Sequence, residues 1–179
     1  MPGTSVQRMQ TPTVAVLPSG PSGATTPSPL ARQVAGRERA LLLSLGLWAA
    51  TSIAAGVPLL RAGRAHQRPA LTAIGRQAVG WGLVDAGIAL WGATRGRRPV
   101  VADDAAARRR AARLLAVTSA NALLDVGYLA AAARLARDPR RRWDGVGMVP
   151  QAAFLLWLDT RHSAGFLEYV RPRARRGHR

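Results

Sequence analysis

Residues 41–60, "LLLSLGLWAATSIAAGVPLL", decide the fold class of this chain. The stretch carries no charged residue, with Arg37, Glu38 and Arg39 before it and Arg61 after it. An α-helix rises about 1.5 Å per residue, so about 20 apolar residues cross the ~30 Å hydrocarbon core of a bilayer. The stretch therefore predicts a transmembrane helix.

Three further apolar segments follow the first, each with a polar residue in its body and charged residues around it. Alternating patterns typical of strands are missing from the sequence, so we expect an all-α fold. The expectation is a bundle of four transmembrane helices within residues 37–170. The predicted helices cover about 38–62, 70–94, 105–136 and 146–168.

The two ends of the chain have a different composition from these segments. Pro, Gly, Ser and Thr make up 18 of the first 30 residues, a stretch with too few apolar side chains to join a core. We expect a disordered, Pro/Ser/Thr-rich tail over 1–36. The last nine residues, 171–179, form a basic tail.

The formal net charge is +17, and all 26 basic residues are arginine. Clustered arginine can indicate nucleic-acid binding. Here, however, apart from Arg76, the arginines fall in the tails and in the gaps between apolar segments, which is typical of membrane loops near anionic lipid. We therefore expect lipid-bilayer and anionic-lipid contacts and no nucleic acid. A homo-oligomer or a membrane partner stays open.

Arginine counts also predict a location and an orientation. Arginine without lysine in an alanine-rich chain suggests a GC-rich bacterial genome, and hence the inner membrane. The N-terminal tail, the loop around residue 100 and the C-terminal part hold 17 arginines, and the other two loops hold 8. Because the more basic loops stay in the cytoplasm, both termini are expected inside.

Catalytic motifs are missing from the sequence. Without cysteine the chain has no thiol nucleophile, disulfide or iron–sulfur site. It also lacks a serine nucleophile turn, a glycine-rich phosphate loop and a metal-binding histidine pair. We expect no enzyme activity, no catalytic residue, no metal and no cofactor.

Polar residues recur at helical spacing inside the apolar segments. Gln77, Trp81 and Asp85 are four residues apart and share one helix face, and Gln151 and Asp159 repeat the outer two positions. The third segment carries its own polar stripe. The predicted interior cluster comprises Gln77, Trp81, Asp85, Asn121, Asp125, Tyr128, Gln151 and Asp159.

Two interpretations of this cluster stay open at the level of sequence. An ionised carboxylate near the middle of a bilayer costs roughly 2.5 to 3.5 kcal/mol, so each acid must be protonated, paired or hydrated. The acids could simply fix which helix packs on which through hydrogen bonds, in a structural or partner-binding bundle. Alternatively, Asp85 and Asp125 could bind or transport a proton, an ion or a small polar ligand.

The sequence also contains an internal similarity. At an offset of 74, "QAVGWGLVD" aligns with "QAAFLLWLD", which suggests a duplicated helical hairpin. A rival offset of 40 aligns "LVDAGIAL" with "LLDVGYLA". Both alignments rest on few identities.

Three motifs carry a resemblance to a known family: "WGLVDAGIALWG", "NALLDVGYLAAA" and "GVGMVPQAAFLLWLD". The chain resembles a family of small bacterial four-helix membrane proteins of unknown function, over roughly residues 38–165. The resemblance implies the fold and the choice of residues but no reaction. The matching positions are Trp81, Gly82, Asp85, Asn121, Asp125, Tyr128, Gly145, Gly147, Gln151, Phe154 and Asp159.

Overall fold

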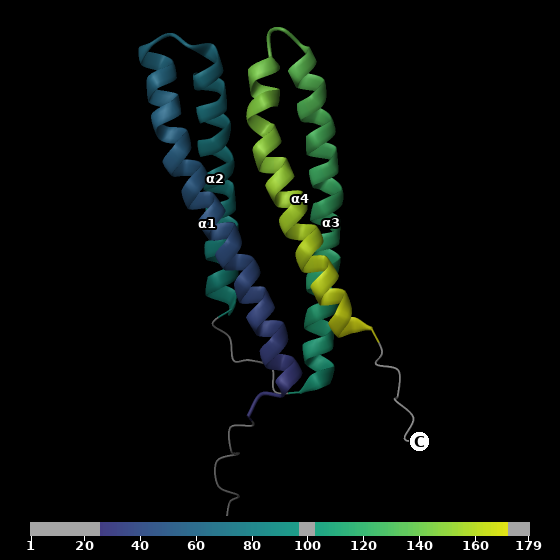
Figure 1. Cartoon of the computed structure of the whole chain (residues 1–179). Coiled ribbons are helices and arrows are strands. Elements are labelled where there is room, and N and C mark those ends of the chain that lie inside the picture. Colours follow the sequence, from purple (N-terminus) through teal and green to yellow (C-terminus); the bar gives the residue numbers. More distant parts are fainter. Residues whose placement is uncertain (1–25, 97–102, 172–179) are drawn as a thin grey trace, which may run out of the picture.

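The computed structural model describes residues 26–96 and 103–171, which form four long helices and no strand (Figure 1). The predicted all-α, four-helix architecture is confirmed. Most of the predicted N-terminal tail and nearly all of the basic C-terminal tail lie outside the described residues. The helices are α1 (Pro29–Ala65), α2 (Pro69–Gly96), α3 (Asp104–Arg137) and α4 (Arg142–Val170).

Helix α1 begins nine residues before the expected start, so the part of the predicted tail from 29 to 36 is helical instead. Ser28 caps the helix by accepting a hydrogen bond from the Ala31 N–H at 3.1 Å, and Pro29 occupies the first turn, where its missing N–H costs little. Val34 is then buried in a small core with Phe166 of α4. Tertiary packing thus extends the helix into a region that composition alone assigned to the tail.

The helices form two antiparallel hairpins, α1–α2 and α3–α4, which lie side by side and spread apart toward their turns (Figure 1). Within each hairpin the backbones touch. A Cβ at Gly75 would overlap the Leu60 backbone of α1, and a Cβ at Gly145 would overlap the backbone at Ala132 and Ala136 of α3. Such close approach through small residues is typical of packing between membrane helices.

Contacts between the hairpins are fewer than contacts within them. Helix α2 packs on α4, and the N-terminal half of α1 reaches both α3 and α4. Among the described residues, α2 and α3 have no backbone contact. Side chains alone therefore bridge the flank between α2 and α3.

The helix boundaries fit the internal repeat at an offset of 74. Shifting α1 and α2 by 74 residues places them at 103–139 and 143–170, within two residues of α3 and α4. The rival offset of 40 places α2 on α3, so it does not superimpose the α1–α2 hairpin on the α3–α4 hairpin. The boundaries thus agree with the hairpin-sized repeat.

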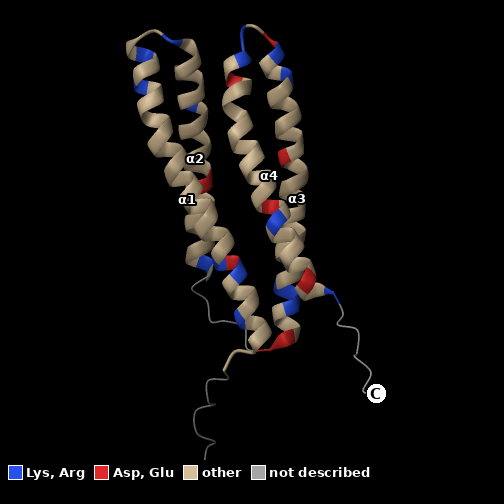
Figure 2. Ribbon diagram, viewed as in Figure 1, with Lys and Arg blue, Asp and Glu red and all other residues tan. Residues whose placement is uncertain are grey.

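Large side chains lie on the outside of the bundle and small ones in its interior. Eight of the twelve buried hydrophobic residues are alanine, so alanine and not leucine makes most of the core. Leu123, Leu47 and Leu90 are 75%, 71% and 68% exposed. The charged residues gather mostly toward the two ends of the helices (Figure 2).

Within the described residues, α1 and α3 are long and apolar enough to cross a membrane, as judged by length and composition alone. Helices α2 and α4 do not meet the same measure.

Candidate functional site: a buried acidic cluster

Three aspartates from three different helices meet inside the bundle. Asp85 of α2, Asp125 of α3 and Asp159 of α4 are 2%, 3% and 7% exposed. The Asp125 and Asp159 carboxyls lie within hydrogen-bonding reach of one another, and Asp85 is close enough for its charge to act on both. The structure thus brings together the acids of three of the predicted transmembrane segments.

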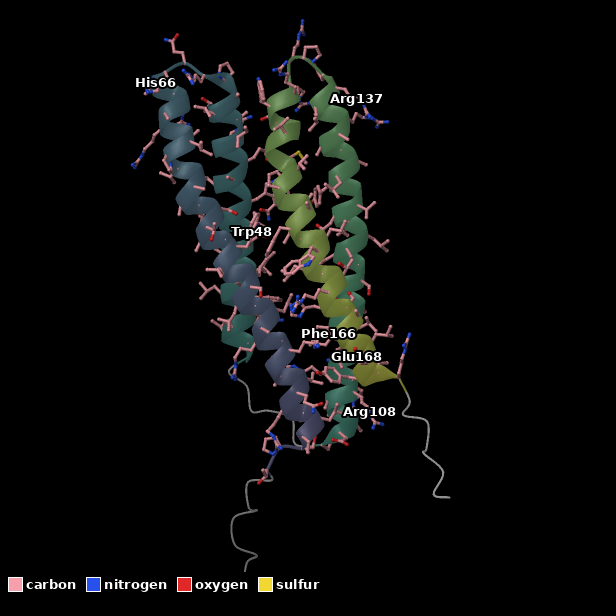
Figure 3. All side chains as sticks on the ribbon, in the orientation of Figure 1. Trp48, His66, Arg108, Arg137, Phe166 and Glu168 are labelled. Atoms are coloured by element: carbon pink, nitrogen blue, oxygen red, sulfur yellow. The ribbon has the colours of Figure 1, made fainter. Side chains whose placement is uncertain are left out.

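Gln151 of α4 links the cluster to two other helices. Its amide nitrogen donates to Asp85 Oδ2 of α2, and its Oε1 accepts a hydrogen bond of 2.7 Å from Trp48 Nε1 of α1. The Trp48 ring also stacks on Phe154, with centroids 4.1 Å apart (Figure 3). One chain of hydrogen bonds therefore joins α1, α4 and α2 at a single level.

Sequence reasoning missed Trp48, because tryptophan in a membrane segment is expected at the interface. The signal that could have found it is its position. Trp48 lies near the middle of the charge-free stretch 41–60 and not at one of its ends. An indole N–H that is shielded from water needs an acceptor, and Gln151 supplies it to the half-buried Trp48.

A group of hydroxyls lies next along α3 and α4. Ser163 Oγ of α4 lies 2.7 Å from Thr118 Oγ1 of α3, and Ser119 Oγ lies 3.4 Å from Ser163 Oγ. Thr118 precedes Asp125 by two helical turns and is 2% exposed. The polar interior therefore continues from the acids toward the end of the bundle at which α1 and α3 begin.

Two buried polar atoms have no hydrogen-bond partner among the described residues: Asp125 Oδ2 and His162 Nδ1. Buried polar groups nearly always have a hydrogen-bond partner. A bound proton, a water or a ligand would supply the partner that each of these two atoms lacks. No arginine in the described part forms an ion pair with any of the three acids. The cluster is therefore short of donors.

A positive charge from α1 lies against α4 on the inner side of the bundle. The Arg37 guanidinium lies against Gly165 of α4, where any Cβ would overlap it, and sits over the Tyr169 ring at 5.9 Å. Beyond it, Arg110 Nε donates to Glu38 at 2.7 Å, and this hydrogen-bonded pairing raises the pKa of the Arg110 guanidinium.

Four of the predicted cluster residues lie at its edge or outside it. Asn121 is exposed, so its predicted inward orientation is wrong. The buried face of α3 runs through Thr118, Ala122 and Asp125, and Asn121 lies beside that face, on the flank shared with Tyr128 seven residues later. The α2 and α3 backbones do not approach each other, so side chains alone bridge this flank and Asn121 stays exposed.

The other three edge residues make packing contacts. Trp81 is half-buried and meets the partly exposed Tyr128 edge-on, with ring centroids 5.1 Å apart. Gln77 is also half-buried, and its side chain packs against Gly147 of α4. A Cβ added at Gly147 would lie 3.1 Å from the Cβ and Cγ of Gln77. The two aromatic rings and Gln151 help to line a hollow of about 10 Å³, which has room for one water at most.

The arrangement suits proton sharing or packing better than metal chemistry. No group of three or more His, Cys, Asp or Glu within the described ranges is placed to hold a metal ion. Carboxyls that face one another without a cation can share protons or accept hydrogen bonds from amides. The site therefore offers proton exchange or interhelical hydrogen bonding.

The model of a protein family matches residues 44–160. The chain belongs to the family of unknown function DUF6992. The matched range takes in the three buried aspartates, Gln151 and Trp48, and it leaves out the start of α1 and the end of α4. The resemblance to an uncharacterised family is thus confirmed. No curated protein and no solved structure is significantly similar to the chain.

Replacing Gln151 tests whether the hydrogen-bond chain holds the DUF6992 bundle together. Gln151→Leu leaves the buried Asp85 carboxyl and the half-buried Trp48 N–H without partners, which should cost on the order of 1–3 kcal/mol of unfolding free energy. The matched control is Gln77→Leu, at the equivalent position of the first hairpin but half-buried, with an expected change of about 0.5 kcal/mol or less. Thermal unfolding in detergent, followed by circular dichroism, measures both. Equal stability of the two variants would show that the chain of hydrogen bonds is not structural.

Proposed function

We propose that the chain is a four-span integral membrane protein of a bacterial inner membrane, with both termini in the cytoplasm. Its primary role is that of a structural or partner-binding helical bundle with an acidic interior, and we assign it no catalytic activity. The observation that carries the proposal is where the charged residues lie along the four helices.

Each helix has a window in its middle that is bounded by charged residues. At about 1.5 Å per residue, the windows span roughly 24 to 32 Å, close to the ~30 Å of a hydrocarbon core. The charged residues inside them are Asp85, Asp125 and Asp159, and all three are buried. The windows are 40–60 in α1, 77–94 in α2, 114–133 in α3 and 145–160 in α4.

The exterior of the same windows supports a lipid surrounding. Every exposed large hydrophobic side chain in the described part of the chain lies in one of the four windows. A water-soluble bundle would turn such residues inward and its aspartates outward, because burying apolar area drives folding in water. Here large apolar groups face out and carboxyls face in, so this distribution favours the membrane even for α2 and α4, whose composition alone is less apolar.

Tryptophan and arginine at the window ends support the same placement. The Arg95 guanidinium lies 3.9 Å from the Trp91 ring at one end of the bundle, and Arg142 lies 4.2 Å from the Trp143 ring at the other. Tryptophan and arginine are typical of the two membrane interfaces, where arginine contacts anionic lipid headgroups.

In this proposal the buried acids act first as packing groups. Asp85 accepts from Gln151 and so ties α2 to α4, the main contact between the two hairpins. The flank beside Asn121 and the exposed apolar windows are the surfaces that a second copy or another membrane protein could cover. The bundle would then serve as a scaffold within the bilayer.

A second candidate function is proton or cation transfer through the acidic cluster. Asp125 Oδ2 favours it, since among the described residues this buried atom has no hydrogen-bond partner. The hydroxyls of Thr118 and Ser163 continue the polar interior toward the cytoplasmic end. A proton could pass along such groups.

Fractionation tests the membrane assignment. After cell breakage the chain should stay in the membrane pellet through washes with high salt and with alkaline carbonate, and only detergent should release it. Peripheral proteins held by arginine contacts leave the pellet under these washes, because salt screens their charges. Recovery of the chain in the wash without detergent would rule out four-span insertion.

Proton flux tests the second candidate. Proteoliposomes that hold a pH-sensitive dye and are driven by a potassium diffusion potential should acidify or alkalinise at least tenfold more slowly with Asp125→Asn than with the wild-type chain. Asp138→Asn, which removes an acid from the exposed α3–α4 turn, is the control and should leave the flux unchanged. A wild-type flux equal to that of empty liposomes would leave only the packing role.

A further inference from the structure

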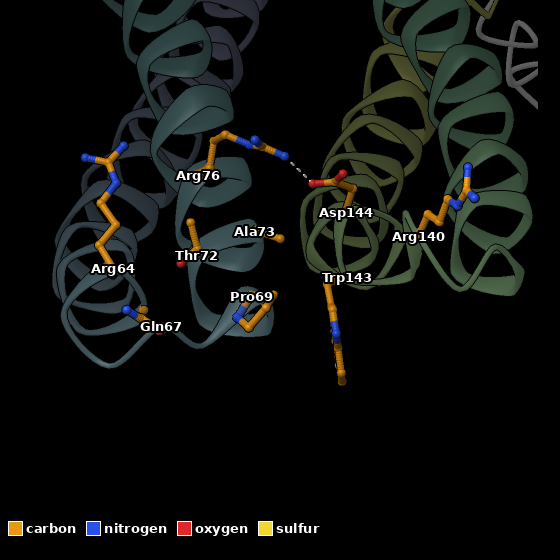
Figure 4. A pocket seen from close by; sticks show the side chains of 10 residues that line it. Arg64, Gln67, Pro69, Thr72, Ala73, Arg76, Arg140, Trp143 and Asp144 are labelled. Carbon is orange, nitrogen blue, oxygen red and sulfur yellow. Dashed lines mark hydrogen bonds and ion pairs between the residues drawn. The ribbon is translucent and has the colours of Figure 1, made fainter.

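A second polar site lies far from the acids, between the turns of the two hairpins. The hairpins touch where Gly147 of α4 meets Ile74 and Gln77 of α2, and beyond that contact they leave a hollow of about 470 Å³. Its floor is the ion pair between Arg76 and Asp144, 2.6 Å long, which bridges α2 and α4 (Figure 4).

Positive charge dominates the lining of this hollow. Arg64 and Arg140 stand on opposite hairpins, and the single lining carboxylate, Asp144, is already paired with Arg76. The positive charges of Arg64 and Arg140 are therefore not neutralised by any carboxylate that lines the hollow. Both side chains are exposed, so their rotamers can turn toward a bound anion on the picosecond to nanosecond scale.

The backbone adds to the positive potential. Helix α2 starts at Pro69, which lines the hollow, and its first turn contains no acidic residue. The partial positive charge of this helix N-terminus is thus not offset by a side chain of its own turn, and helix N-termini favour phosphate groups. Trp143 and Ala73 supply apolar wall beside the charges.

We propose that the hollow between the hairpin turns binds a phosphate-bearing anion. A guanidinium group matches the oxygens of a phosphate, to which arginine donates two parallel hydrogen bonds. In a membrane, Trp143 would place the hollow at the interface, at the level of phospholipid headgroups. The same chemistry would also hold a soluble phosphate ester. An anion here would bridge the two hairpins at the end where they diverge.

The test compares two double variants of the full chain, purified from membranes in neutral detergent. Arg64→Gln with Arg140→Gln removes the two free charges of the hollow and keeps the Arg76–Asp144 pair. Arg61→Gln with Arg137→Gln is the matched control, because it removes the same charge from exposed positions three residues earlier that do not line the hollow. Glycerol phosphate titrated by calorimetry and phosphatidylglycerol retained in native mass spectrometry are the probes, with phosphatidylcholine as the neutral-headgroup reference.

We expect wild type and the control to bind at least one probe, and Arg64→Gln/Arg140→Gln to bind it about tenfold more weakly. Binding of phosphatidylglycerol alone identifies a lipid headgroup, whereas binding of glycerol phosphate as well identifies a soluble phosphate ester as sufficient. Equal weakening in both double variants, or binding of neither probe, would overturn the proposal. Pellet fractionation of the same variants reports the membrane assignment separately, so the two conclusions can fail independently.

Discussion

The hydrogen-bond chain from Trp48 through Gln151 to Asp85 is the interaction on which the rest of the structure depends. It joins three helices, and it crosses from one hairpin to the other through groups that are buried and polar. In a low-dielectric interior such bonds are strong when complete and expensive when one member is lost. The chain therefore specifies the packing of the two hairpins in a way that the small alanine side chains around it could not.

Within each hairpin, specificity comes from shape. Glycines such as Gly75 and Gly145 bring backbones into contact, and alanines fill the remaining core. Because glycine and alanine make the contacts within each hairpin, the interior has positions that can hold three carboxyls. In the proposed membrane setting the surroundings are themselves apolar, so large apolar side chains are not needed inside, leucine and valine face outward and interior positions are free for polar groups. The agreement of all four helix boundaries with a shift of 74 residues fits two copies of one such hairpin joined by polar contacts.

Apolar segments flanked by arginine predicted the four helices and their number, because charge placement along the chain is a long-range pattern visible in sequence. The three aspartates could be found for the same reason, as the few charges within those segments. Other features needed the tertiary structure. Residues 29–36 are helical because Val34 packs on Phe166, a contact between residues far apart in sequence. Asn121 has helical spacing that places it only slightly off the buried face, and it is exposed because the α2 and α3 backbones do not approach each other. The Arg37 guanidinium against Gly165 likewise has no local signal.

The central claim is that the outward apolar surface of the four windows faces lipid. Because the chain has no cysteine, single cysteines can be introduced without background. Leu123→Cys, at a position 75% exposed in the bundle, and Asp138→Cys, in the exposed α3–α4 turn, are treated with a membrane-impermeant maleimide in sealed vesicles of known orientation. The account predicts that Asp138→Cys reacts from the periplasmic side and that Leu123→Cys reacts from neither side until the protein is denatured. Labelling of Leu123→Cys as fast as Asp138→Cys in intact vesicles would contradict it.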